Sequence, residues 1–120
     1  MSRRRIAQRG DVFWIDPNPI AGREIKDRYR FVVITPKEIN VLGIAMTVPV
    51  SSGGVFARDM GLTVPITGHD AVGVAVCDQV RSFDLDALQR AGSARFVETL
   101  DMSIVEEIVS RVLSVIDPAS

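Results

Sequence analysis

The chain has 120 residues, of which 47% are hydrophobic and 24% are charged, a composition typical of one globular domain. Its single cysteine, Cys77, excludes an internal disulfide and favours a reducing compartment. No run approaches the roughly 20 apolar residues of a membrane span, and the N-terminus lacks the apolar stretch of a signal peptide. We therefore expect one cytoplasmic domain over residues 1–120, with a flexible basic N-terminus over residues 1–9.

Charge is unevenly distributed along the chain, although the net charge is only −1 at pH 7. Residues 1–60 carry 10 Lys or Arg against 6 Asp or Glu, whereas residues 61–120 carry 4 against 9. Such asymmetry can mark a face that binds a polyanion. It can also arise by chance, because halves of a chain are not halves of a folded molecule.

The first half of the chain contains two apolar runs that predict strands. Residues 12–15 form a short run with Trp14, bounded by polar and proline residues. Residues 31–35 are apolar until the last position, which is typical of a central strand buried on both faces. Residues 36–40 are interpreted as one helical turn.

Three further strands are expected. Residues 44–50 form one, and Pro49 indicates an edge or a bulge at its end. Residues 62–66 alternate as in a half-buried edge strand. Residues 72–80 form the last, and a period of two places Asp78 in line with four valines. A carboxylate in such a column is either paired or functional.

Residues 102–116 change to a helical period, with valine and isoleucine on one stripe and charged residues or serine opposite. Asp101 is a plausible N-cap and Pro118 ends the helix. The pattern predicts a mostly β domain with α: a small, strongly curved antiparallel sheet or barrel with a C-terminal amphipathic helix.

The loop over residues 17–30 is the most informative segment. A connection this long in a small domain is usually functional or disordered. Tyr29 offers a ring for base stacking, so the loop suits phosphate or single-stranded nucleic acid; a solvated loop is the alternative. Its cations, which outnumber its carboxylates, are Arg23, Lys26, Arg28 and Arg30.

Metal and nucleotide-loop chemistry are not expected. His69 stands alone in a turn-like Thr-Gly-His-Asp segment, and no carboxylate and histidine cluster has metal-ligand spacing. The Gly-rich segment at residues 51–54 lacks the length and the lysine of a phosphate-binding loop. We predict no cofactor and no metal.

Several motifs occur in an order that resembles the MazF/PemK family of type II toxin-antitoxin endoribonucleases, most of all its Kid/PemK and ChpB branch. The resemblance runs from about Gly10 to Leu88. The motifs are Gly10-Asp-Val-Phe-Trp-Ile-Asp-Pro17, Ala21-Gly22-x-Glu24, Thr35-Pro36-x-x-x-Asn40, Val48-Pro-Val-Ser-Ser-Gly-Gly-x-Phe56-Ala57-Arg58 and Gly73-Val-x-x-Cys77-Asp78-Gln79-x-Arg81.

The resemblance implies a dimeric SH3-like barrel that cleaves single-stranded RNA without metal and is silenced by a cognate antitoxin. In this chemistry the ribose 2'-OH attacks the adjacent phosphate, leaving a 2',3'-cyclic phosphate and a 5'-OH end. The reaction needs a base, cations or donors for the phosphorane oxygens, and an acid for the leaving oxygen.

The family roles imply a set of site residues. Asp78 matches the family base, and Ser51 matches a threonine that stabilises the transition state. The family arginine two residues before the aspartate is Val76 here, and the family histidine is Arg23. The family Arg-Pro pair falls on Tyr29-Arg30, so its arginine is displaced to Arg28 or Arg30. The remaining residues expected to bind RNA are Lys26, Tyr29, Ser52, Phe56, Arg58, Gln79 and Arg81.

Two mechanisms remain open for this site. In the first, Asp78 has its proton affinity raised in an apolar column and acts as the base, while arginines and Ser51 hold the phosphate. In the alternative, the catalytic set is incomplete and the protein binds RNA or antitoxin without turnover. Asp78 could also pair with Arg81 in a purely structural role. Toxins that bind DNA gyrase share the same small barrel, and fold alone does not separate these functions.

Overall fold

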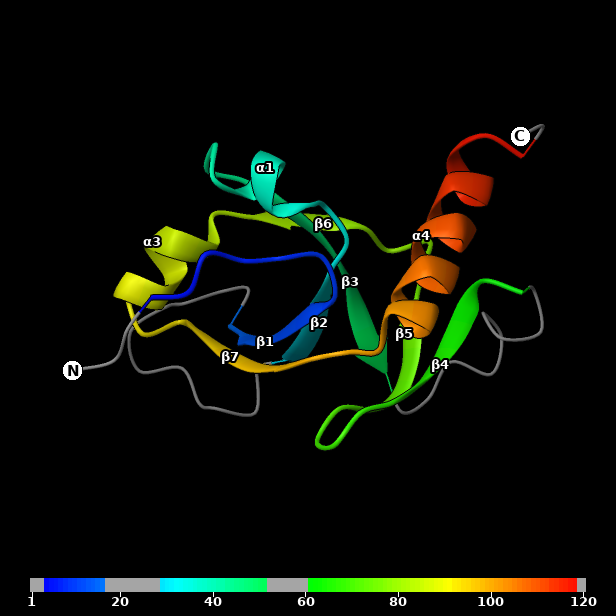
Figure 1. Cartoon of the computed structure of the whole chain (residues 1–120), viewed down its shortest axis with the longest axis horizontal. Helices are drawn as coiled ribbons and strands as arrows, with labels where there is room; N and C mark the ends of the chain where they lie inside the picture. The colour runs from blue at the N-terminus through cyan, green and yellow to red at the C-terminus, as the bar shows by residue number, and fades with distance from the viewer. Residues whose placement is uncertain (1–3, 17–28, 52–60, 119–120) are drawn as a thin grey trace.

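The structure is a computed structural model that describes residues 4–16, 29–51 and 61–118. Strands dominate these segments, and one long helix lies near the C-terminus (Figure 1). In chain order the elements are β1 (Asp11–Ile15), β2 (Tyr29–Val33), α1 (Lys37–Asn40), β3 (Ala45–Ser51), β4 (Thr63–Thr67), β5 (Val72–Val76), β6 (Arg81–Phe83), α3 (Leu85–Arg90), β7 (Ala94–Thr99) and α4 (Met102–Ile116).

The strands form one 7-stranded sheet in the order β4-β5-β3-β2-β1-β7, with β6 paired to β3. All of the pairings are antiparallel. The expected antiparallel sheet with a C-terminal helix is confirmed. The expected closed barrel is wrong, because the terminal strands β4 and β7 do not pair with each other in the described part of the chain. Short strands leave this opening to be bridged by side chains.

Both faces of the sheet are buried, and each packs against a different layer. Phe31, Val32 and Val33 are all buried, as the continuous apolar run predicts. Val12 and Val32 belong to a core that includes α4 and the β4–β5 hairpin. Phe13 and Phe31 belong to a second core with the N-terminal segment and α3. The alternation of neighbouring residues between two cores explains why the runs at β1 and β2 are continuously apolar.

Helix α4 has the bounds that its periodicity predicts. Val105, Ile108 and Val112 are its buried residues and face the core. Asp101 occupies the N-cap position, but its side chain makes no capping hydrogen bond. The helix is therefore held by burial of its apolar stripe rather than by its cap.

Strand β3 lies inside the sheet, so of the two alternatives expected for Pro49, an edge or a bulge, the structure contradicts the edge. Pro49 lies opposite Phe31 of β2 on one side. On the other side, β3 pairs with β6 through Thr47 and with β5 from Val50 onward. Pro49 thus falls where β3 changes partner, a place where a missing N–H is tolerated.

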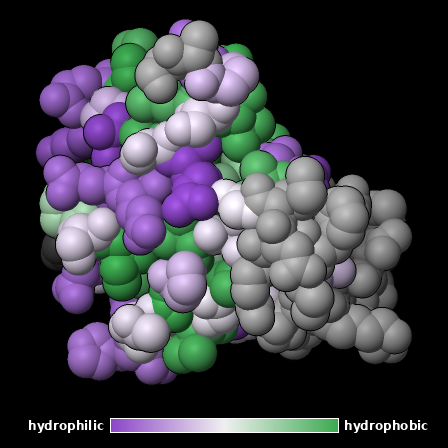
Figure 2. All heavy atoms as spheres, turned by 90° about the vertical axis from the view of Figure 1, so that its right-hand side faces the viewer, coloured by the Kyte–Doolittle hydropathy of each residue, from purple (hydrophilic) through white to green (hydrophobic). Residues whose placement is uncertain are grey.

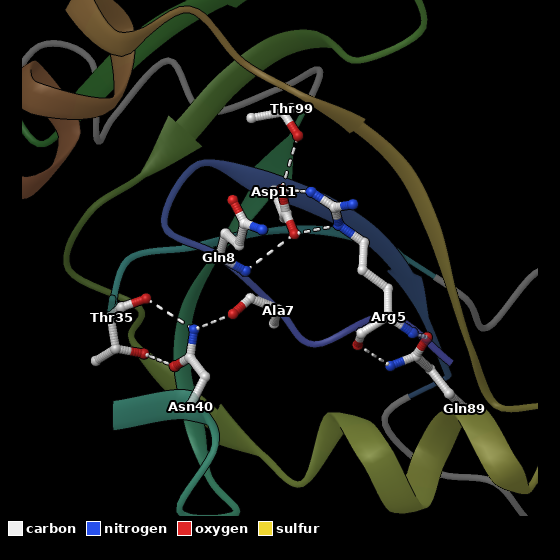
Figure 3. A network of polar contacts seen from close by, with 8 residues as sticks. All are labelled: Arg5, Ala7, Gln8, Asp11, Thr35, Asn40, Gln89 and Thr99. Atoms are coloured by element: carbon white, nitrogen blue, oxygen red, sulfur yellow. Dashed lines mark hydrogen bonds and ion pairs between the residues drawn. The ribbon is translucent and has the colours of Figure 1, made fainter. Parts of the chain in front are cut away.

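The N-terminal segment was expected to be flexible over residues 1–9, but residues 4–9 are anchored to the domain. The backbone N–H and C=O of Arg5 bind the Gln89 side chain reciprocally, each at 2.9 Å (Figure 3). Asn40 donates to the carbonyl of Ala7 at 2.8 Å and to that of Thr35 at 2.9 Å. The spaced Thr35 and Asn40 motif therefore has a structural role, which is to fasten α1 to this segment.

Asp11 fixes the same segment to the sheet from a fully buried position (Figure 3). Its carboxylate accepts hydrogen bonds from Arg5 Nε at 2.7 Å, the Gln8 N–H at 3.0 Å and the Thr99 hydroxyl at 2.7 Å. The Asp11 carboxylate raises the pKa of Arg5, mainly through this hydrogen bond. A buried carboxylate is tolerated because its charge is paired and its oxygens are hydrogen-bonded.

Candidate functional site

The Cys77-Asp78-Gln79 motif forms a bulge beside β3. Strands β5 and β6 both run antiparallel to β3, with Ala75 opposite Val50 and Arg81 opposite Thr47. Six steps along the chain from Ala75 to Arg81 are matched by only three steps along β3, so three residues are extruded between the strands. Bulges of this kind commonly re-aim side chains next to functional sites.

Asp78 is exposed in the turn that follows Val76, the last residue of β5. The expectation of a strand through residue 80, with Asp78 in a buried column of valines, is therefore wrong. The extruded residues break the period of two, and the side chain meets solvent rather than the core. No ion pair or side-chain hydrogen bond joins Asp78 to another described residue, so the alternative in which Asp78 pairs with Arg81 has no support among these residues.

Gln79 and Arg81 border Asp78 on the same bulge. Gln79 is exposed, and its N–H donates to the carbonyl of Val76 at 3.2 Å, which closes the turn. Arg81 is exposed at the start of β6, with its guanidinium carbon 5.1 Å from the Phe83 ring centroid. The bulge thus presents a carboxylate, an amide and a cation within four consecutive residues.

Cys77 and Val76, which precede Asp78, are both buried. The Cys77 side chain is buried among apolar residues, and this burial raises the pKa of its thiol to about 11. Val76 is 4% exposed, so the position at which the family resemblance implies an arginine is a packed core position here. Neither residue is available to a substrate in the described structure.

Tyr29 and Ser51 lie at one end of the sheet, because β2 begins at Tyr29 and antiparallel β3 ends at Ser51. Tyr29 is 51% exposed, and Ser51 is half-buried opposite Val74 of β5. In the chain, the cationic loop precedes Tyr29 and the segment at residues 52–60 follows Ser51.

Arg30 lies apart from Asp78 and has partners of its own. Its guanidinium donates to the carbonyls of Asp70 at 2.8 Å and Val72 at 3.1 Å, and lies 5.6 Å from the Trp14 ring centroid. Val72 begins β5, whereas Asp78 lies beyond its end. The four residue steps of β5 span roughly 13 Å at about 3.3 Å of rise per residue, so Arg30 binds at the opposite end of this strand from the turn that holds Asp78.

Six of the expected site residues lie outside the described residues: Arg23, Lys26, Arg28, Ser52, Phe56 and Arg58. Sequence reasoning also missed one residue that the structure makes conspicuous. Glu98 on β7 accepts backbone hydrogen bonds from the turn between β4 and β5. No local sequence signal identifies it, because its partners are 27 to 29 residues away.

The outer face of α4 offers a different kind of surface. Met102, Leu113 and Ile116 are 60%, 56% and 66% exposed. Figure 2, which views the molecule from the α4 side, shows hydrophobic patches interrupted by hydrophilic side chains. A groove of about 510 Å³ runs beside Met102 and Leu113 and also contacts Arg9 and Glu106. None of the described helices is long and apolar enough to cross a membrane.

An antiparallel β sheet, a C-terminal helix and a polar bulge define a small β domain with an exposed carboxylate site. Residues 8–116 match the family described as PemK-like, MazF-like toxin of type II toxin-antitoxin system. The chain therefore belongs to the MazF/PemK family of type II toxins.

Curated relatives agree with this assignment. The chain is 30% identical over 117 residues to Endoribonuclease PemK of Escherichia coli, covering 95% of this chain and 85% of that protein. It is 30% identical over 120 residues to Endoribonuclease toxin ChpB of Escherichia coli K12, covering 98% and 100%.

Solved structures share the fold. The MazE-MazF complex (Form-II) from Deinococcus radiodurans matches with a TM-score of 0.74 and 24% identity, covering 97% of this chain and 99% of that chain. An endoribonuclease in complex with its cognate antitoxin from a mycobacterial species matches with a TM-score of 0.67 and 11% identity, covering 95% and 97%. At these identities the likeness concerns the fold alone.

Proposed function

We propose that this protein is a toxin that cleaves single-stranded RNA through attack of a ribose 2'-OH on the adjacent phosphate, without a metal ion. The products are a 2',3'-cyclic phosphate and a 5'-OH end. The observation that carries this proposal is the bulge, which presents Asp78 to solvent with Gln79 and Arg81 beside it. Membership of an endoribonuclease toxin family supports the same reaction class.

Asp78 is the base in this proposal. A base must come within hydrogen-bond reach of the 2'-OH, and an exposed carboxylate with no described partner can do so without first breaking an ion pair. Gln79 is placed to contact the base or ribose of the same nucleotide.

The phosphate requires cations, and Arg81 is the described arginine nearest to Asp78 in the chain. A guanidinium can hold two phosphate oxygens through parallel hydrogen bonds. Arg28 and Arg23 remain proposed ligands from the cationic loop, with Lys26, Ser52, Phe56 and Arg58 as further RNA contacts. Ser51 and Tyr29, at the end of the sheet that this loop leaves, complete the proposed surface.

The test is cleavage of a long single-stranded RNA by purified protein in excess EDTA. We expect fragments with 5'-OH and 2',3'-cyclic phosphate ends, and no cleavage of a substrate with 2'-deoxyribose at the scissile position. Loss of activity in EDTA, or 5'-phosphate ends, would contradict the proposed chemistry.

A second candidate is a family member that binds RNA or antitoxin without turnover. The burial of Val76 favours it, because a packed valine stands where the family resemblance implies an arginine two residues before the aspartate. RNA binding without any cleavage in the same assay would select this candidate. A third, gyrase binding, requires that the protein inhibit gyrase while leaving RNA intact.

The proposed partners are a second copy of the chain and a cognate antitoxin whose segment carries acidic and apolar residues. Cations and exposed apolar side chains on one molecule suit such a segment. Scattering mass of the purified protein, and copurification with the product of the adjacent gene, test the two partners separately. A monomer that ignores this product would contradict both.

A further inference from the structure

The turn between β4 and β5 is held by a carboxylate from another strand. Glu98 on β7 accepts hydrogen bonds from the N–H groups of His69 at 2.8 Å, Asp70 at 2.7 Å and Ala71 at 2.8 Å. Three successive N–H groups that converge on one anion form a nest, a geometry in which a charged acceptor is strongly favoured. Partial burial raises the pKa of Glu98, but these three hydrogen bonds outweigh it and lower the pKa below its usual value.

Arg30 on β2 holds the same turn from the donor side. It donates to the carbonyls of Asp70 and Val72, so donors and acceptors of the turn are both bound by side chains of the main sheet. Asp70 is held twice, through its N–H by Glu98 and through its C=O by Arg30. We call Arg30, Glu98 and the turn at residues 68–72 the hairpin clamp.

Two glycines show that the clamp and the strand behind it need close backbone approach. A Cβ built on Gly68 would lie 2.6 Å from Glu98 Oε1, so a larger residue would push the carboxylate out of the nest. Gly73 has a φ of +145°, and a Cβ there would lie 2.7 Å from the Ser51 carbonyl oxygen. Gly73 therefore lets β5 start directly against the end of β3.

The clamp matters for the bulge because the described residues provide a short ladder between β5 and β3. In that part of the chain two residue pairs define their register, Val50 with Ala75 and Ser51 with Val74. A ladder this short specifies register poorly by itself. The three extruded residues are defined relative to that register, so a shift of β5 would move Asp78 and Gln79 with it.

We propose that Arg30 and Glu98 are positioning residues that pin the β4–β5 turn and, through β5, hold the bulge with Asp78 in its working place. The sequence predicted Arg28 or Arg30 as a ligand of the transition state. In this proposal Arg30 instead binds backbone carbonyls of the β4–β5 turn, not the phosphate. The functional half of this inference rests on the proposed RNA cleavage. Its structural half does not.

Amide hydrogen exchange measured by NMR tests the structural half. Glu98→Gln removes the charge that binds three N–H groups, and Arg30→Lys keeps the charge but loses the two-carbonyl fork. We expect each variant to accelerate exchange at Asp70, Ala71 and the Gln79 N–H by about tenfold or more. Matched controls are Glu106→Gln on α4 and Arg95→Lys on β7, where both side chains are exposed. These controls should leave the exchange rates of the same amides unchanged.

Two exchange results would overturn the proposal. Acceleration at the turn without any at Gln79 would show that the clamp does not reach the bulge. Equal acceleration across all protected amides would show general destabilisation only. Gly68→Ala attacks the clamp from the turn side and should reproduce the pattern of Glu98→Gln.

Single-turnover cleavage separates positioning from phosphate binding. For the folded fraction of Arg30→Lys and Glu98→Gln, we expect the saturated rate to fall about tenfold or more while the RNA Kd stays within about twofold and its salt dependence is unchanged. The double variant should lose little more than either single one, since both act through one turn. A raised Kd with a salt slope lower by about one phosphate, in the Arg30 variant alone, would overturn the proposal. If the parent does not cleave RNA at all, the proposed function fails and the exchange experiment decides the clamp alone.

Discussion

Cys77 and Asp78 are neighbours with opposite environments, which is the clearest result at the residue scale. The thiol is buried in the core, and the carboxylate next to it is exposed on the bulge. Two adjacent side chains in an extended strand point to opposite faces. The bulge keeps that alternation at Cys77 and then carries Asp78 away from the sheet.

The first prediction concerns the Cys77 thiol. Because burial raises its pKa to about 11, the reactive thiolate is scarce and inaccessible near neutral pH. At pH 8 the folded protein should react with an aromatic disulfide reagent at least about 100-fold more slowly than the same protein in denaturant. Equal rates in both states would show that Cys77 is exposed and would contradict the packing of the bulge.

Val76 supplies the second prediction. Val76→Arg looks like the restoration of a family residue, but it places an unpaired charge in a 4% exposed position. We expect the free energy of unfolding to fall by about 3 kcal/mol or more, measured with urea. Leu113→Arg on α4 is the control, because that apolar side chain is 56% exposed and lies outside the hairpin clamp. A stable Val76→Arg variant with higher turnover would instead identify the natural protein as a weakened enzyme.

At the scale of elements, the N-terminal segment is joined to the sheet by one buried carboxylate, and this gives the third prediction. Asp11→Ala removes the acceptor for Arg5, Gln8 and Thr99. We expect a loss of about 3 kcal/mol in the free energy of unfolding. Asp86→Ala, which breaks exposed pairs with Arg4 and Arg90, is the control and should cost less than about 1 kcal/mol. Similar losses in both variants would contradict the role of Asp11.

The hairpin clamp gives the fourth prediction, on pH dependence. A carboxyl whose pKa is lowered by folding adds stability above its unfolded-state pKa and loses it as the pH falls through the lower folded-state pKa. Between pH 6 and pH 3, stability should therefore fall less for Glu98→Gln than for the parent. The charge of His69 also lowers the pKa of Glu98, so the comparison is repeated in His69→Gln to remove this contribution. Parallel curves for parent and Glu98→Gln would contradict the clamp.

Elements set by local pattern could be read from the sequence, whereas those set by distant partners could not. The helical stripe of α4 and the apolar run of β2 are local, and both are confirmed. Distant contacts are needed for strand β7, helix α3 and the anchoring of residues 4–9. Arg5 and Gln89, for example, are in contact although they are 84 residues apart. The end of β5 was misplaced because a bulge adds residues without changing the local composition.

The prediction of the candidate site was limited in the same way, because it could use local patterns but not contacts with distant residues. The spacing of the motif that contains Asp78 and Gln79 predicted burial of Asp78, whereas the structure has both residues exposed on the bulge. Arg30 was grouped with Asp78 because the family resemblance displaces the expected arginine to Arg28 or Arg30. Its contacts with the carbonyls of Asp70 and Val72 depend on tertiary structure that no spacing reveals.

The whole molecule combines an open antiparallel sheet, a clamp that fixes the β4–β5 hairpin, and a bulge that carries the proposed base. The sheet is not closed by a backbone ladder between β4 and β7, and the Glu98 side chain bridges part of that opening. Asp78, Gln79 and Tyr29 are exposed in this arrangement. Their exposure supports the proposed RNA substrate, which is a long polymer rather than a small ligand.

The fifth prediction tests the central claim, which is that Asp78 is the base for RNA cleavage. Asp78→Asn keeps the size and exposure of the side chain but removes its ability to take a proton. We predict that the saturated single-turnover cleavage rate falls by about 100-fold to 10,000-fold, while the melting temperature and the RNA Kd stay close to those of the parent. Cleavage by Asp78→Asn at the parental rate would contradict the mechanism and remove Asp78 from the site.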